Sequence, residues 1–140
     1  MLFQDSITTS NATGTANAPT TLANITIGGG TVPNDKGVRV DLRVNAPFGA
    51  GTYQIKLGSV VLFNGALVQE QDARLRILVI RKGASTGLVA IDYADQWGGW
   101  APVSESEVGG FSWSTAQALT VVATSDTEGG IVLQRAQVER

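Results

Sequence analysis

Apolar side chains alternate with polar ones at every second position along much of this 140-residue chain. The clearest example is the segment 38–44, where four apolar residues alternate with Arg39, Asp41 and Arg43. A period of two places the apolar side chains on one face of a β-strand and the charged ones on the other. No stretch of a dozen residues shows the helical period, so the pattern indicates an all-β chain.

Further strands are expected at 53–57, 60–63, 74–81, 88–93, 118–124 and 131–138. Asn64-Gly65 is typical of a tight hairpin turn, because both residues tolerate positive φ. Residues 74–81 begin with alternation and become apolar on both faces, which predicts a central strand that is covered on both sides near its end. The segment 94–112, with two Gly-Gly pairs and Pro102, is expected to be a long connection.

Seven or eight short strands with turn signals about every ten residues predict an antiparallel β-sandwich or barrel. A jelly-roll-like sandwich fits best, because a long connection before the penultimate strand suits a Greek-key crossover. The size of the chain suits one domain. Trp113 and Phe111 are expected in its core.

Residues 1–19 are rich in Ser, Thr, Asn and Ala and show almost no periodicity, so an extended N-terminal arm is predicted ahead of a sandwich domain at 20–140. Such an arm is either a frayed terminus or a segment that becomes ordered across a neighbouring subunit. Leu2, Phe3 and Ile7 would be its anchoring side chains in the second case.

The composition excludes most catalytic chemistry. The chain contains no histidine and no cysteine, so it has no Ser/His/Asp triad, thiolate nucleophile, disulfide or His/Cys metal site. A carboxylate pair, a lysine base or a magnesium site would still be compatible with the sequence. The chain is therefore expected not to be an enzyme and to use no metal or other cofactor.

The charge and the N-terminal residues bear on partners and location. The net charge of −2 gives no basic footprint for nucleic acid. The first residues contain neither a basic start nor a continuous apolar stretch, so no signal peptide or membrane span is expected. The protein is predicted to fold in the cytoplasm.

Several segments together resemble small jelly-roll domains in virion proteins of tailed bacteriophages. They are the Thr-rich start at 20–30, the strand at 38–44, the strand at 75–81 with its Gly/Ser loop, and the ending at 118–121 and 131–139. The resemblance covers roughly residues 20–140 and contains no invariant signature. It implies a virion component that is made in the host cytoplasm, commonly a homotrimer.

The short chain and its polar arm favour a capsid decoration protein, which would bind the major capsid protein on the outer shell and stabilise it. The alternative is a tail-fibre or head-fibre module that binds a host glycan or receptor. That alternative would use the aromatic loop at 93–100, where Trp97 and Trp100 accompany Tyr93 and Asp95. Tryptophans are also common anchors of protein interfaces, and this interpretation is favoured.

Arg39, Arg43, Arg74 and Arg76 form the second candidate surface. If the strands 38–44 and 74–81 are neighbours, these four side chains line one outer face, which would suit an acidic capsid or partner surface. The competing interpretation is an ordinary solvated sheet face with Asp41 and Asp72 interleaved.

Overall fold

The computed structural model describes residues 4–7, 11–95 and 98–139, and its elements are β-strands. In chain order the strands are β1 Gln4–Ile7, β2 Asn11–Ala12, β3 Thr20–Ile27, β4 Gly37–Asn45, β5 Gly51–Leu57, β6 Val60–Leu67, β7 Asp72–Arg81, β8 Thr86–Asp95, β9 Ala101–Gly109, β10 Gln117–Ser125 and β11 Val132–Glu139.

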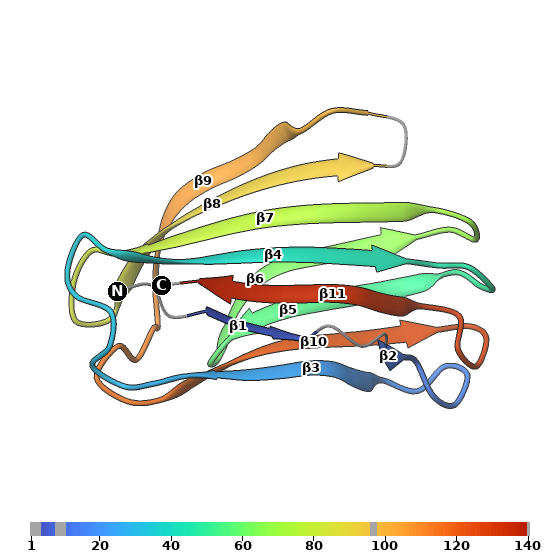
Figure 1. Ribbon diagram of the computed structural model, residues 1–140, viewed down its shortest axis with the longest axis horizontal. Helices are drawn as coiled ribbons and strands as arrows, with labels where there is room; N and C mark the ends of the chain where they lie inside the picture. Colours follow the sequence, from blue (N-terminus) through green and yellow to red (C-terminus); the bar gives the residue numbers. More distant parts are fainter. Residues whose placement is uncertain (1–3, 8–10, 96–97, 140) are drawn as a thin grey trace.

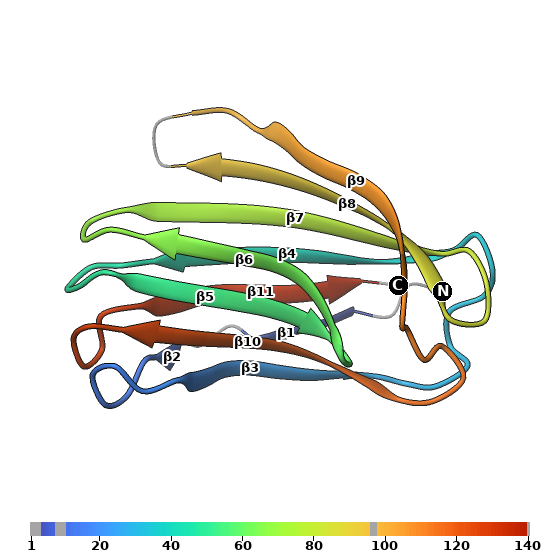
Figure 2. The ribbon, with the colours of Figure 1, turned by 180° about the vertical axis from the view of Figure 1, so that it is seen from behind.

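Two antiparallel sheets pack face to face (Figures 1 and 2). The larger, called sheet A here, has the order β1-β11-β4-β7-β8-β9, with β2 also paired to β11. The smaller, sheet B, has the order β3-β10-β5-β6. The chain crosses repeatedly between the sheets, as in Greek-key and jelly-roll arrangements. The predicted all-β, jelly-roll-like sandwich is confirmed.

The core lies between the sheets and follows the alternation in the sequence. In β4, Val38, Val40, Leu42 and Val44 are at most 3% exposed, whereas the arginines between them point outward. β7 repeats this pattern and pairs with β4 on one side and β8 on the other. Phe111 and Trp113 are buried as predicted. The prediction of cover on both faces of β7 is wrong, because Leu78 is 37% exposed on the outer face.

Asn64-Gly65 is not a hairpin turn, contrary to the prediction. Both residues lie within β6, where Asn64 pairs with Gln54 and Gly65 pairs with Tyr53. Gly65 occupies this position because the ring of Tyr53 lies against its backbone. The chain turns later, over residues 68–71.

The segment 94–112 is not an irregular connection, because it contains β9. This strand pairs with β8 at the edge of sheet A, beyond the part of the sandwich that β6 covers (Figures 1 and 2). Residues 101–107 are all exposed, so the strand buries neither face and shows no alternation of apolar and polar residues. That exposure explains why the sequence pattern missed it.

Two short strands of the N-terminal segment belong to sheet A. β1 and β2 both pair with β11 of the same chain. Thr13 is 3% exposed, and its Oγ1 accepts a hydrogen bond from the Ile131 amide at 3.2 Å. The segment is extended as expected, and pairing with β11 satisfies part of its backbone. No helix in the described ranges is long and apolar enough to cross a membrane.

Candidate functional site

The outer face of sheet A collects arginines from three neighbouring strands. β4 and β7 pair with Arg43 opposite Arg74 and Asp41 opposite Arg76. The two strands are neighbours, as the predicted arginine surface requires, and all four predicted arginines lie on one exposed face. β11 adds a fifth arginine on the other side of β4. We call the following residues the arginine–tryptophan patch: Arg39, Arg43, Arg74, Arg76, Arg135 and Trp100.

Acidic side chains are interleaved with the patch, as the competing interpretation expected. Asp41 lies between two arginines, with 3.5 Å to Arg39 Nε and 3.4 Å to Arg76 Nε. The Nη2 atom of Arg39 is also 2.6 Å from a carboxylate oxygen of Glu139. The paired arginines keep about half of their side-chain surface exposed, so each pair stabilises the fold by at most about 1 kcal/mol.

Arg43 has a different acidic partner, Asp72, whose Oδ2 accepts from Arg43 Nη2 at 2.9 Å. Arg135 donates to the side-chain oxygen of Gln137. Neither Arg74 nor Arg135 forms an ion pair with a described residue. The five arginines outnumber the three acids that pair with them, and a fourth acid, Asp92, stands opposite Arg76 in the pairing of β7 with β8. Together these groups have a net positive charge of one.

Trp100 lies over this charged face. It belongs to the predicted aromatic loop, so the structure brings a residue of that loop onto the predicted arginine surface. The guanidinium carbon of Arg76 is 4.3 Å from the centre of the Trp100 ring, and that of Arg74 is 5.6 Å away. Both distances are typical of cation–π contacts. Trp100 directly precedes β9, the strand that pairs with β8 at the edge of sheet A. The ring remains 41% exposed.

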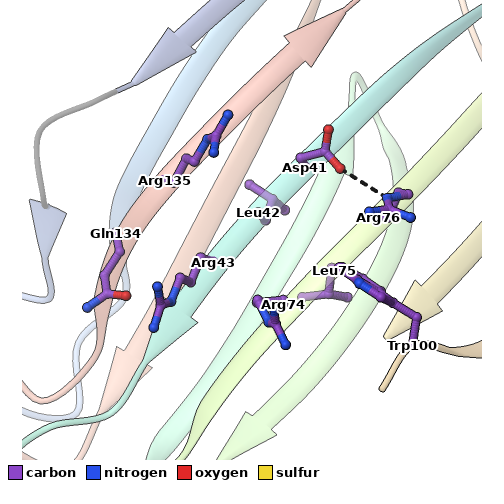
Figure 3. Close-up of a pocket in the computed structure, with 9 residues that line it drawn as sticks. All are labelled: Asp41, Leu42, Arg43, Arg74, Leu75, Arg76, Trp100, Gln134 and Arg135. Atoms are coloured by element: carbon purple, nitrogen blue, oxygen red, sulfur yellow. Dashed lines mark hydrogen bonds and ion pairs between the residues drawn. The ribbon is translucent and has the colours of Figure 1, made fainter. Parts of the chain in front are cut away.

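Leucine backbones and arginine side chains enclose a hollow of about 590 Å³ on this face (Figure 3). Its lining comes from β4, β7, β11 and the residue before β9, and comprises Asp41, Leu42, Arg43, Arg74, Leu75, Arg76, Trp100, Gln134 and Arg135. Figure 3 shows Arg43 and Arg74 pointing the same way from adjacent strands, whereas Arg135 extends away from them. Such a surface can bind anionic groups and place an indole ring against an adjoining apolar or planar group.

The sequence interpretation missed Gln134 and Arg135. The register between β11 and β4 shifts between Leu133 and Arg135, so strict alternation does not hold at this point. The available signal was two consecutive polar residues, Gln134 and Arg135, which interrupt the alternation of the final strand. That signal does not show which strand lies beside them.

The predicted aromatic site at 93–100 is not assembled as one group. Tyr93 is opposite Leu75 in the pairing with β7 and packs against the core, so it lies on the inner face of sheet A. Burial, followed by the nearby charges of Asp95 and Asp72, raises the pKa of Tyr93. Trp100 lies on the outer face instead. Asp95 accepts a hydrogen bond from the Gly98 amide at 2.6 Å.

Three predicted partner-binding residues, Leu2, Phe3 and Trp97, lie outside the described residues. The backbone of Ile7 is described and pairs with Ala136 of β11. Among the described residues, no three acidic side chains come close enough together to hold a metal ion.

The comparisons with known proteins bear on the fold. No protein-family model matches the chain, and no curated protein matches its sequence. Among solved structures, a peanut lectin with a nine-residue peptide is similar, with a TM-score of 0.59 and 6% sequence identity over 99% of this chain and 97% of the lectin chain. At this identity the similarity shows a shared sandwich fold.

Proposed function

We propose that this protein is a non-enzymatic attachment module that binds an acidic surface of a larger assembly through the arginine–tryptophan patch. The observation that carries the proposal is the gathering of five arginines and an exposed tryptophan on one open face. Arginine and tryptophan are enriched at the energetic centres of protein interfaces. A hollow lined by arginine and tryptophan side chains is suited to bind an acidic side chain that projects from a partner surface.

The resemblance to jelly-roll virion proteins supports a particular assembly, the capsid of a tailed bacteriophage. In this role the chain is a decoration protein that binds the major capsid protein on the outer shell and stabilises it. The same resemblance supports a homotrimer at a symmetric site. A decoration protein needs no catalytic group, which agrees with the lack of histidine and cysteine.

Charge reversal within the patch tests this function. Arg74→Glu should weaken attachment to particles stripped of the protein by at least about tenfold, because it removes an attraction and adds a repulsion. The matched control is Lys56→Glu, which changes the charge equally on the opposite sheet. Attachment is measured by co-sedimentation with the particles as salt is raised.

Wild-type attachment should also weaken with salt, because exposed charges are screened. If both variants attach as well as the wild type, or if Lys56→Glu is as damaging as Arg74→Glu, the patch does not mediate attachment. Particles that resist heat equally well with and without the protein would contradict the stabilising role.

A second candidate is a fibre module that binds a host glycan. The observation in its favour is Trp100, whose exposed ring lies beside polar side chains that could bind sugar hydroxyls. This function predicts glycan-array binding that Trp100→Ala abolishes. An array without binding at high protein concentration would exclude it.

A further inference from the structure

Three arginines stand in direct register across the centre of sheet A. Arg135 of β11 is paired with Arg43 of β4, and Arg43 is paired with Arg74 of β7. Side chains paired in this way have Cβ atoms about 5 Å apart on the same face. We call these three residues, which all line the hollow, the arginine row (Figure 3).

The row is electrostatically unfavourable for the isolated protein. Like charges placed directly opposite each other destabilise a pair of strands. Among the residues that the structure describes, one carboxylate, that of Asp72, forms an ion pair with the row, and it pairs with the central member, Arg43. The neighbouring cross-strand row differs, because there Asp41 stands opposite Arg76 and bonds to it.

The two outer members of the row, Arg135 and Arg74, are therefore available to bind an external anion. Arg135 and Arg74 are exposed and have no ion pair among the described residues. Contacts with Gln137 and with Trp100, respectively, restrict their side chains without neutralising them. They lie two strand spacings apart, which is roughly 10 Å.

We infer that the arginine row binds two carboxylates of an acidic peptide segment, a refinement that rests on the proposed attachment function. Guanidinium groups present paired N–H donors that match carboxylate oxygens. Same-face side chains of an extended peptide repeat about every 7 Å, and flexible Asp or Glu side chains span the remaining distance to the row. The overall acidic charge of the chain disfavours a nucleic acid as the partner.

A synthetic octaglutamate peptide serves as the probe. Binding of the fluorescently labelled peptide to the full chain is measured by anisotropy at low ionic strength. Arg74→Gln and Arg135→Gln should each weaken binding by roughly fivefold, the upper range for an exposed ion pair. The control is Lys56→Gln, which removes one positive charge from the opposite sheet, outside the patch; it should weaken binding less than about twofold.

Thermal unfolding of each variant separates a lost contact from a lost fold. Loss of Arg135 relieves repulsion, so Arg135→Gln should unfold at the same temperature as the wild type or higher. A large decrease would show that the residue is structural and would overturn the inference.

Three binding results would also overturn the inference. They are no octaglutamate binding, an equal loss in Lys56→Gln, and binding of a heparin-derived oligosaccharide without binding of the peptide. The attachment assay distinguishes this failure from that of the proposed function. Row variants that still attach to particles would refute the row alone, whereas peptide binding without particle attachment would refute the capsid role and leave the row intact.

Discussion

The ring of Tyr53 lies against the backbone of Gly65, its partner across β5 and β6. A Cβ at Gly65 would lie 2.3 Å from Cζ of that ring and 2.5 Å from its hydroxyl oxygen. The ring has little room to move, because it is 2% exposed and packs edge-on against Phe63 with 6.0 Å between centroids. Burial also raises the pKa of Tyr53, so the hydroxyl stays neutral.

This contact predicts that Gly65→Ala lowers the free energy of unfolding by about 1–3 kcal/mol, the usual cost of overpacking a core. Urea denaturation measures the change. Gly109→Ala is the control, because a Cβ there meets nothing within 4 Å. Equal stability of the two variants would show that Tyr53 does not constrain the position.

At the scale of strands, alternation located β4 and β7, although it did not predict that the outer face of β7 is exposed or that β6 continues through Asn64 and Gly65. β4 and β7 followed from the pattern, and so did the four arginines between their apolar residues. β9 could not be found in this way, because it buries neither face and its Ser and Glu residues are exposed on both. β1 and β2 were missed because they are ordered by backbone pairing with β11. Backbone pairing leaves no periodic pattern in the sequence.

The assembly of the candidate site also depends on pairing between strands. Trp100 reaches Arg74 and Arg76 because β9 folds back along β8, and a strand order cannot be read from periodicity. Arg135 joins the row through the pairing of the last strand with β4, next to a register shift. The sequence therefore identified most of the charged side chains but not how they combine with the tryptophan and with β11.

At the scale of the whole molecule, the two outer faces of the sandwich differ in charge. Sheet A carries the arginine–tryptophan patch, whereas the fully described strands of sheet B contain one charged residue, Lys56. The proposed attachment would therefore place sheet A, and not sheet B, toward an acidic partner. An isolated domain gains little stability from the exposed ion pairs of the patch, so their arrangement is better explained by binding.

An electron cryomicroscopy image of capsids decorated with the protein tests the central claim most directly, because it shows both where the sandwich binds and which face it presents. If the patch mediates attachment, density should lie on the outer shell with β4, β7 and β11 toward an acidic surface of the major capsid protein. Density in which sheet B meets the shell, or saturated particles without added density, would contradict it.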